Sequence, residues 1–357
     1  MSIKKDGKSI VLRPFCIGIL AFLGLGAWAA ADGPVADFPS FTSFSIAKTG
    51  DVAIDKVGNV YVNVTEATNP GPTKIWKFSP SGEGPFVVAS LGVGTAFGLA
   101  VDPKGDLYAA IRTGTYSAIY RVDRNGSAFL IPRSDQIVWA NALAFDQRGN
   151  LYVTETYSLA SPSGFGQGGI WRIPPGGAAE LWVRDPLLTG AGAAPIGANG
   201  IGYYHGNLYV VNSNTKNIVQ VPIRPDGSPG QPDVWAVLQE VPESPQAIRN
   251  ALPLTGDGIA LDVHGNLYIT VVTRASIVRI DAEDFSQDTV ATFFAAPSDP
   301  IFAPLDTPNT IGFGTGMGGR QTVFVTNMGQ MKAALGPPWA GAGIVKIAAG
   351  VPGLPLP

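Results

Sequence analysis

The stretch NALAFDQRGNLYVTE, from Asn141 to Glu155, decides the fold. It is an alternating apolar run, a turn that contains Gly, and a second alternating run, which is the pattern of a β-hairpin. The Gly permits the positive φ that a tight hairpin loop needs and that a residue with a Cβ resists. Five further copies are GDVAIDKVGNVYVNV (50–64), FGLAVDPKGDLYAAI (97–111), NGIGYYHGNLYVVN (199–212), DGIALDVHGNLYITV (257–271) and the looser NTIGFGTGMGGRQTVFVTN (309–327).

The aromatic residue after each turn marks the length of the repeat. These aromatics are Tyr61, Tyr108, Tyr152, Tyr209, Tyr268 and Phe324, at spacings of 47, 44, 57, 59 and 56 residues. Repeats of this length that each contain several strands are typical of a β-propeller.

Further strand-like runs complete each repeat. A third run follows every hairpin, at residues 74–78, 118–122, 169–173, 217–221, 276–280 and 343–347. A fourth follows in most repeats, as PFVVA, AFLI, AELWV, DVWAV and TVATFF. The sequence therefore predicts an all-β fold: a six-bladed β-propeller with four-stranded antiparallel blades.

The sixth repeat has no fourth strand, because the sequence ends in AAGVPGLPLP. At the other end, FPSFTSFSIA (38–47) is a strand-like run that belongs to no repeat. We expect this N-terminal strand to close the ring as the outer strand of the last blade. Such closure protects sheet edges that would otherwise pair with other chains.

Residues 1–31 have the pattern of a secretory signal peptide. A basic start (Lys4, Lys5, Lys8 and Arg13) precedes the apolar run CIGILAFLGLGAWAA and a small-residue cleavage site at 29–31. The alternative is an uncleaved anchor, but the run is short and Gly-rich for a membrane span. We expect a secreted or periplasmic protein with a single propeller domain over residues 32–357, and a monomer.

The composition excludes several classes of function. Losing the signal removes four of 24 basic and one of 27 acidic residues, which leaves 20 against 26, a balance of −6. An acidic balance argues against a nucleic-acid partner. The only cysteine, Cys16, lies in the signal, so the mature chain has no disulfide or catalytic thiol. His205 and His264 both occupy hairpin turns, away from the axis, which argues against a serine triad or a His-rich zinc site.

Propellers place the first strand of each blade along a central channel, so the residues that begin these strands form a column. This column reads Gly50, Phe97, Asn141, Asn199, Asp257 and Asn309. Four of the six residues are Asn or Asp, and their side-chain oxygens suit a hard cation such as Ca²⁺. The alternative is that these side chains bond their own backbone, as Asn and Asp at strand starts often do.

The segments NGI and DGIALD, each followed by GNLYV or GNLYI, resemble the senescence-marker-protein/gluconolactonase family of six-bladed propellers, in some ways also NHL repeats. The resemblance implies hydrolysis of a lactone or ester with one divalent metal in the channel. It implies that Asn141, Asn199 and Asp257 are metal ligands and that Asp257 is the catalytic base. Asn309 is a fourth candidate ligand.

The chain departs from the family at the first blade, where the family has a metal-binding Glu. Gly50 stands there, and we expect the adjacent Asp51 to face the opposite side of the strand. With Asp257 as the single carboxylate, the expected Ca²⁺ affinity lies at the weak end, roughly 10⁻⁴ to 10⁻³ M.

Three further residues are candidates for substrate binding: Glu155, Arg112 and Tyr203. For Glu155 the alternative is that it braces a loop.

The leading hypothesis is an exported, calcium-dependent lactonase or esterase. The alternative is a non-catalytic, NHL-like propeller that binds a ligand or a protein partner through its loop face. A metal-dependent lyase ranks third, because such propellers rely on histidine and the column has none.

Overall fold

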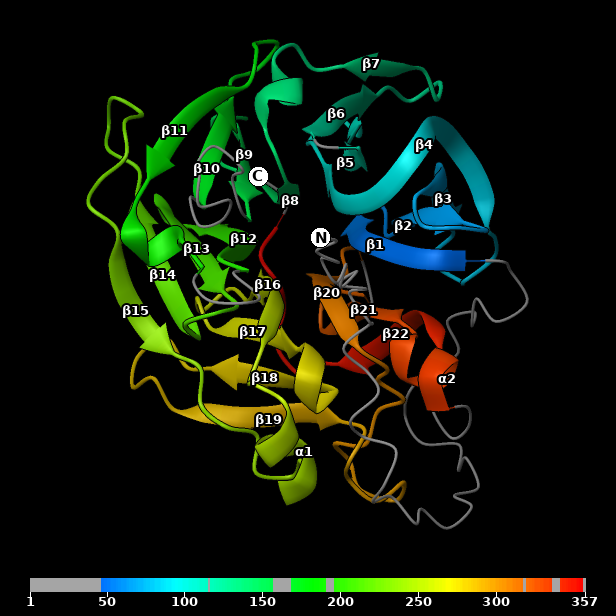
Figure 1. Cartoon of the computed structure of the whole chain (residues 1–357), viewed down its shortest axis with the longest axis vertical. Coiled ribbons are helices and arrows are strands. Elements are labelled where there is room, and N and C mark those ends of the chain that lie inside the picture. The colour runs from blue at the N-terminus through cyan, green and yellow to red at the C-terminus, as the bar shows by residue number, and fades with distance from the viewer. Residues whose placement is uncertain are drawn as a thin grey trace, which may run out of the picture.

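Antiparallel strands arranged around a central axis make up most of the structure, in a propeller-like all-β fold (Figure 1). The computed structural model describes residues 46–114, 116–156, 168–190, 196–316, 319–335 and 341–355. The expected signal segment (1–31) and residues 38–45 of the expected closing strand lie outside this described part.

The first sheet holds seven strands in chain order: β1 (Ile46–Ile54), β2 (Val60–Glu66), β3 (Gly71–Phe78), β4 (Phe86–Val101), β5 (Leu107–Thr113), β6 (Tyr116–Val122) and β7 (Ala128–Leu130). The next sheet holds β8 (Ala140–Phe145), β9 (Leu151–Glu155), β10 (Gly169–Ile173) and β11 (Glu180–Arg184). The third holds β12 (Ala198–Tyr204), β13 (Asn207–Asn212), β14 (Asn217–Pro222) and β15 (Asp233–Val237).

The fourth sheet holds β16 (Gly256–Leu261), β17 (Leu267–Val271), β18 (Ser276–Ile280) and β19 (Gln287–Thr292), and the last holds β20 (Pro308–Phe313), β21 (Thr322–Met328) and β22 (Ala342–Ala348). The helices are α1 (Gln246–Ala251) and α2 (Gln330–Leu335), with 3-10 turns at η3 (Ser134–Gln136), η4 (Pro186–Leu188) and η5 (Val272–Arg274). All six hairpins and all six third strands predicted from the repeat are present.

One strand departs from the predicted pattern. β4 continues without a break from the fourth strand of the first repeat into the first strand of the second, so seven strands share one sheet. Its residues up to Gly94 pair with β3, and those from Thr95 pair with β5. Gly92, at φ +86°, lies just before this change of partner and still pairs with Thr73 of β3. A glycine permits the bend there, and Figure 1 shows the curve.

An aspartate before each of four hairpin turns explains the repeated phrase D-x-x-G-[ND]-x-Y. In the third repeat Asp146 Oδ1 accepts the backbone N–H groups of Arg148 and Asn150 at 2.9 Å. Its Oδ2 accepts from the Asn150 amide at 2.8 Å and from the Tyr152 hydroxyl at 3.3 Å. Burial and the Asp146 charge raise the pKa of Tyr152. The side chain therefore fixes both the turn and the first aromatic of the next strand.

The core lies between adjacent sheets. Buried residues of β13 and β17 form one cluster that includes Val211 and Ile269, and equivalent clusters fill the other gaps. Aromatic pairs join neighbouring repeats at edge-to-face angles, for example Tyr108 with Phe145 at 5.1 Å.

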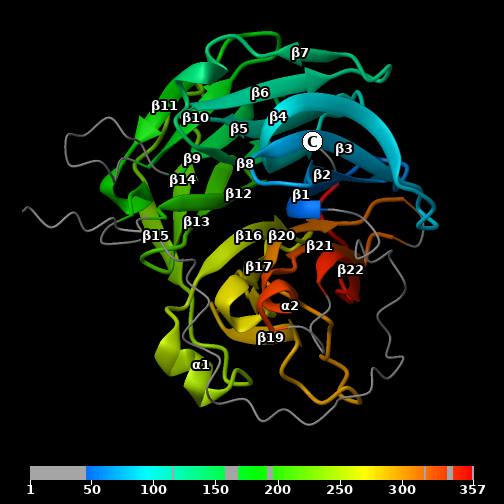
Figure 2. The same ribbon diagram turned by 45° about the vertical axis from the view of Figure 1, so that its right-hand side comes forward.

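The last sheet and the first strand are joined by hydrogen bonds. The Thr326 hydroxyl and the Asn309 amide donate to the carbonyl oxygen of Gly50 at 3.0 and 3.1 Å. The Thr49 hydroxyl donates to the Asn327 carbonyl at 2.8 Å. The first strand and the last sheet therefore meet next to the axis, where Figures 1 and 2 show β1 beside β20.

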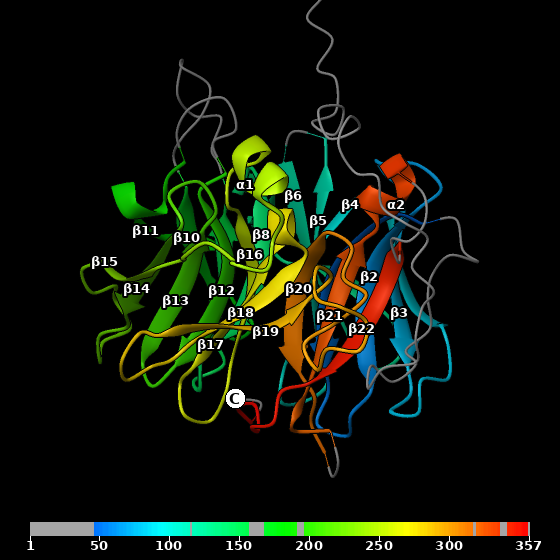
Figure 3. The same cartoon turned by 90° about the horizontal axis from the view of Figure 1, so that it is seen from below.

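The two faces of the ring differ. Figure 3 shows α1 and α2 at one face and the end of the chain at the other. At the face where the chain ends, the Leu354 N–H donates to the Leu261 carbonyl at 3.2 Å and the Gly353 N–H donates to the Arg320 carbonyl at 2.9 Å. Within the described residues, no helix has the length and apolar character needed to cross a membrane.

Candidate functional site

Each inner strand carries an irregularity at the column. In the third repeat Ala140 pairs with Glu155 but Leu143 pairs with Val153, so one residue is extra on the inner strand. The same slip occurs in β1, β4, β12, β16 and β20. A bulge of this kind bends a strand and re-aims its side chains. Here it directs the column residues into the space around the axis.

Glycines after the column residues allow the inner strands to approach closely. A Cβ on Gly98 would lie 2.3 Å from the Asn141 carbonyl oxygen, and one on Gly200 would lie 2.2 Å from that of Asp257. A Cβ on Gly258 would lie 2.6 Å from the Asn309 carbonyl oxygen. Such distances are too short for any side chain. The phrases FGL, NGI and DGI therefore encode tight packing around the axis.

Threonine hydroxyl groups form hydrogen bonds between neighbouring repeats at the level of the column. Thr154 donates to the carbonyl oxygen of Asn199 at 2.6 Å, and Thr270 donates to that of Asn309 at 2.8 Å. Each bond runs from a second strand to the column residue of the next repeat. The backbone of the column is thus held by groups that do not enter the channel.

The predicted column residues line one cavity of about 560 Å³. Asn141, Asn199, Asp257 and Asn309 all reach it, together with Phe97. The structure therefore brings together four oxygen-bearing side chains from four repeats. The cavity lies at the face of the molecule that carries α2, since Gln330 of α2 also lines it.

The expectation that Asp51 faces away from this cavity is wrong, because Asp51 lines it. Gly50 and Asp51 lie inside the β1 bulge, where strict alternation of faces fails. A Cβ on residue 50 would lie 2.2 Å from Asn63 Oδ1 and 2.6 Å from the Phe97 carbonyl, so a side chain has no room there. The first repeat thus supplies its carboxylate from the next position.

The sequence held a signal for Asp51. The position after the column residue is Gly or Ala in four repeats, at Gly98, Ala142, Gly200 and Gly258. An acidic residue at this position of the first repeat breaks that pattern.

Burial and mutual repulsion govern the two carboxyl groups. Burial raises the pKa of Asp257 to about 7, against the attraction of the Lys48 ammonium and a hydrogen bond from Asn199. Burial and the charge of Asp257 raise the pKa of Asp51, against Lys48 and hydrogen bonds from the Leu99 backbone and the Thr310 hydroxyl. Both groups are easily neutralised, by a proton or by a bound cation.

Lys48 also lines this cavity, and sequence reasoning missed it. Its Nζ donates to the Ala96 carbonyl oxygen at 2.6 Å and lies 3.4 Å from the centroid of the Phe97 ring. Burial lowers the pKa of Lys48 to about 8, although Asp51 and Asp257 oppose this shift.

The amides of the column are hydrogen-bonded. Asn141 donates to Asn199 Oδ1 at 2.6 Å and to the Thr156 hydroxyl at 2.9 Å. Asn199 donates to the Ser213 hydroxyl at 2.9 Å. Asn309 Oδ1 accepts from the Thr326 hydroxyl at 2.6 Å. These bonds orient the amides, and the Asn309 oxygen points to its own blade.

The donor set fits a hard divalent cation. Two carboxylates, Asp51 and Asp257, and the amides of Asn141 and Asn199 supply oxygen atoms, which Ca²⁺ prefers. The two carboxylates give a formal charge of −2, where the sequence predicted −1, while Lys48 offsets one charge. Among the described residues no three His, Cys, Asp or Glu side chains form a metal-binding group, so the amides are needed.

The three residues predicted to bind substrate have different positions. Arg112 lines the cavity that holds Asp257. Tyr203 lines a separate cavity of about 400 Å³ at the opposite mouth of the channel, near Leu354. The exposed His205 lies at that mouth too, and the exposed His264 lies in its predicted turn.

Glu155 is fully buried, and its carboxylate has the bonding of a brace. It accepts from the Val138 N–H at 2.9 Å, from the Trp171 indole at 3.1 Å and from Arg184 at 2.9 Å. Burial raises its pKa, against these three donors. It is not among the residues that line the cavity with Asp257.

The equivalent residues of other repeats also hold loops. Asn212 donates to the carbonyls of Leu187 and Thr189 at 2.8 Å, and Asn327 donates to that of Pro304 at 2.9 Å. These second-strand residues, which are not part of the column, therefore fix the connections around the cavity.

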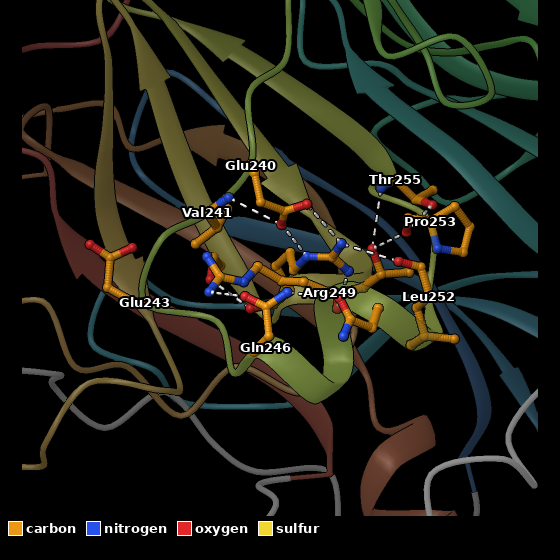
Figure 4. A network of polar contacts seen from close by, with 12 residues as sticks. Glu240, Val241, Glu243, Gln246, Arg249, Leu252, Pro253 and Thr255 are labelled. Atoms are coloured by element: carbon orange, nitrogen blue, oxygen red, sulfur yellow. Dashed lines mark hydrogen bonds and ion pairs between the residues drawn. The ribbon is translucent and has the colours of Figure 1, made fainter.

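A polar network fixes the connection that leads to Asp257 (Figure 4). Arg274, 1% exposed, donates to Glu240 Oε2 and to the Leu252 carbonyl at 3.1 Å each. The Thr273 hydroxyl donates to the Pro253 carbonyl at 2.8 Å. The segment is thus tied to η5 on both sides of α1, at Glu240 and at Leu252 and Pro253, and Pro253 lies three residues before the start of β16.

Comparisons with known proteins agree with this fold. The sequence model of the SMP-30/Gluconolactonase/LRE-like region matches residues 89–307 of this chain, which is more than half of the length of the chain. No curated protein sequence matches. A solved gluconolactonase from Xanthomonas campestris is 17% identical, with a TM-score of 0.57 over 87% of this chain and 88% of its own.

Two other solved structures are similar in fold. A luciferin-regenerating enzyme is 15% identical, with a TM-score of 0.60 over 87% of this chain and 94% of its own. Regucalcin from Agrobacterium tumefaciens, a calcium-binding protein, is 12% identical, with a TM-score of 0.59 over 88% and 93%. At these identities the likeness concerns the fold, whereas the sequence match over residues 89–307 concerns ancestry: the chain belongs to the SMP-30/gluconolactonase/LRE-like family.

Proposed function

We propose that this chain is an exported, metal-dependent hydrolase of the gluconolactonase type, acting on a lactone or an ester. The observation that carries this proposal is that Asp51 and Asp257 share one cavity with Asn141 and Asn199. Membership of the family supports the class of reaction.

Asp51, Asp257, Asn141 and Asn199 would hold the divalent cation, for which we propose Ca²⁺, and Asn309 is a further candidate ligand. The calcium-binding regucalcin of similar fold supports this choice of metal. When bound, the cation would polarise the carbonyl oxygen of the substrate.

Asp257 is the proposed base. The ionised Asp257 would take a proton from water, which lets that water attack the carbonyl carbon. The pKa of about 7 is that of the metal-free carboxyl group, and a bound cation would favour the ionised form. Lys48 favours the ionised form of Asp257, and the Asn199 amide orients it by a hydrogen bond. The bonds from Asn141 to Asn199 and Thr156 keep the neighbouring amide in place.

The experiment is a calorimetric titration of Ca²⁺ into the metal-stripped protein, repeated with Asp257→Asn and Asp51→Asn. Asp288→Asn is the matched control, because Asp288 is exposed on β19. We expect one site that both cavity variants weaken at least tenfold and that the control leaves unchanged. A screen of lactones and esters follows, in which Asp257→Asn should abolish turnover.

Full turnover in Asp257→Asn would reject the mechanism. Absence of Ca²⁺ binding up to several millimolar, the usual weak limit for extracellular calcium sites, would reject the metal.

One observation favours a second candidate, a non-catalytic propeller that binds a ligand or protein through its loop face. The oxygens of Asn199 and Asn309 already accept hydrogen bonds from Asn141 and Thr326. In such a protein the column would stabilise the ring. Neither calcium binding nor turnover would then be observed.

We also propose the finer architecture: six blades, with the seven-stranded sheet counted as two, and closure of the last blade by the N-terminal run expected at 38–47. Ile46 and Ala47 of that run belong instead to β1, where Ile46 pairs with Glu66 of β2, so the proposal concerns residues 38–45. The last sheet supports it, because β22 pairs only with β21 among the described residues. Signal cleavage after residue 31 and a monomeric state complete the proposal. N-terminal sequencing and light scattering of the exported protein test them.

A further inference from the structure

One wall of the cavity consists of alternating cations and aromatic rings. The Lys48 ammonium lies 3.4 Å from the centroid of the Phe97 ring, and the Arg112 guanidinium carbon lies 3.8 Å from a ring centroid of Trp139. The Phe97 and Trp139 rings meet edge to face, with centroids 5.4 Å apart at 68°. All four side chains line the cavity that holds Asp257.

The wall is built from four strand regions that meet near the axis. Lys48 comes from β1, Phe97 from the bulge of β4, Arg112 from the end of β5, and Trp139 precedes β8. The Ala96 carbonyl holds Lys48 Nζ at 2.6 Å, and ring faces attract both cations. The two charged heads are therefore held at the cavity surface, and all four side chains are partly exposed there.

The charges of the lining leave an excess of positive charge once the carboxylates are occupied. Among the described residues, the charged side chains that line the cavity are Lys48, Arg112, Asp51 and Asp257. A divalent cation held by the two carboxylates would neutralise their charge. Lys48 and Arg112 then remain, and a concave site with charge of one sign concentrates ligands of the other sign.

The stacked guanidinium suits an oxyanion. Stacking uses the flat face of Arg112, while its N–H donors lie in the plane of the group, where they match the two oxygens of a carboxylate or phosphate.

We propose that the Lys48–Phe97–Trp139–Arg112 wall binds an oxyanion of the substrate, so that the preferred lactone or ester carries a carboxylate or phosphate group. This proposal rests on the proposed function and narrows its substrate class. The aromatic rings would contact the carbon skeleton next to the anion.

The test compares two esters that differ only in charge: mono-4-nitrophenyl glutarate and its methyl ester. Release of 4-nitrophenolate by the calcium-loaded protein gives kcat/KM for each. We expect at least a tenfold preference for the anionic ester, and a smaller preference at 1 M salt because screening weakens the attraction. Equal values for the two esters would overturn the proposal.

Variants locate the effect. Arg112→Gln and Lys48→Met should each reduce the ratio of the two kcat/KM values about tenfold. Arg121→Gln is the matched control, because Arg121 of β6 also lies over an aromatic ring, that of Phe129 on β7, and is not among the residues that line the cavity. It should leave the ratio unchanged. Cavity variants that reduce both rates equally would show a structural role and contradict the proposal.

A binding measurement separates this proposal from the proposed function. If neither ester is hydrolysed, the hydrolase fails, and glutarate and methyl phosphate are titrated into the protein in saturating Ca²⁺, the state in which Lys48 and Arg112 carry the excess charge. Binding of either that Arg112→Gln weakens at least tenfold supports the subsite, and the stronger ligand identifies carboxylate or phosphate. Binding of neither anion overturns it.

Discussion

Burial and the negative charge of Asp257 raise the pKa of Asp51, although Asp51 comes from the first repeat and Asp257 from the fifth. Both line the same cavity, and burial opposes ionisation of each. Two neighbouring carboxylates that resist ionisation store unfavourable free energy. A bound cation would release that free energy, so the pair links pH, metal binding and stability.

The first prediction concerns the stability of the metal-free protein as a function of pH. The pKa of Asp257 is raised from 3.8 to about 7, so the folded state holds a proton that the unfolded state has lost in this window. The free energy of unfolding should therefore fall as pH rises from about 4 to about 7. Each pKa unit corresponds to at most about 1.4 kcal/mol, less here because Asp257 is partly exposed.

Denaturant unfolding at several pH values measures this slope. Asp257→Asn should flatten it, and Asp288→Asn should not. Lys48 acts in the opposite sense, because its lowered pKa of about 8 makes stability rise with pH between about 8 and 10.5. A stability that increases steadily from pH 4 to 7 in the metal-free protein would contradict the assigned burial of the pair.

The second prediction concerns Gly258, which follows Asp257. An alanine Cβ there would lie 2.6 Å from both the Asn309 carbonyl oxygen and the Thr310 Cα, and backbone atoms cannot rotate away. Gly258→Ala should cost about 1–3 kcal/mol or more, as overpacking does, and should weaken Ca²⁺ binding by displacing Asp257.

Gly206→Ala is the comparison for Gly258→Ala. It has open space around the Cβ but a φ of +80°, so it reports backbone strain without a clash. It should cost roughly 1 kcal/mol and leave Ca²⁺ binding unchanged. Thermal and denaturant unfolding of both variants, with Ca²⁺ titration, make the comparison. A Gly258→Ala protein as stable as the parent would show that the inner strands can separate.

The third prediction distinguishes a brace from a substrate ligand at Glu155. Because its carboxylate accepts from Val138, Trp171 and Arg184, Glu155→Gln places an amide against donors and should cost about 1–3 kcal/mol. The measurement is unfolding together with KM for any substrate identified. A brace predicts lower stability with KM changed less than threefold. An unchanged stability with a tenfold higher KM would assign Glu155 to substrate binding.

Much of the architecture could be predicted because each repeat is determined by short-range features of the sequence. The alternation and the Gly turns located every hairpin, and the Asp146-type turns show why these phrases recur. The long β4 was not predictable from alternation, since the change of partner between Gly94 and Thr95 depends on the neighbouring repeat.

The site was partly predictable for the same reason. The column at Asn141, Asn199 and Asp257 follows from the repeat register alone. Asp51 was misplaced because a bulge suspends the two-residue alternation on which the prediction relied. Lys48 and Trp139 were missed because they reach the cavity from strand ends, through packing between repeats that no single repeat encodes.

The fourth prediction concerns Arg274, whose buried guanidinium ties the segment before Asp257 to η5 (Figure 4). Its hydrogen bonds and charge lower the pKa of Glu240, so the pair stabilises the fold above the unfolded pKa of Glu240 and this contribution disappears as pH falls through the lower folded value.

Arg274→Lys keeps the charge but loses the planar fork that reaches both Glu240 and the Leu252 carbonyl. It should cost about 1–3 kcal/mol, and Arg274→Met should cost more because the Leu252 carbonyl and Glu240 then lose the donor. Arg279→Lys is the control, since Arg279 pairs with Asp281 on a more exposed strand end.

Calcium titration decides whether this network serves the site or only the fold. If the segment positions Asp257, Arg274→Lys should weaken Ca²⁺ binding several-fold at a temperature where the variant is fully folded. An affinity equal to that of the parent, with reduced stability, would show that β16 holds Asp257 in place without help from the preceding segment. The hydrogen bond from the Gly258 N–H to the Thr270 hydroxyl, and the bond from that hydroxyl to the Asn309 carbonyl, would then be sufficient to position the carboxylate.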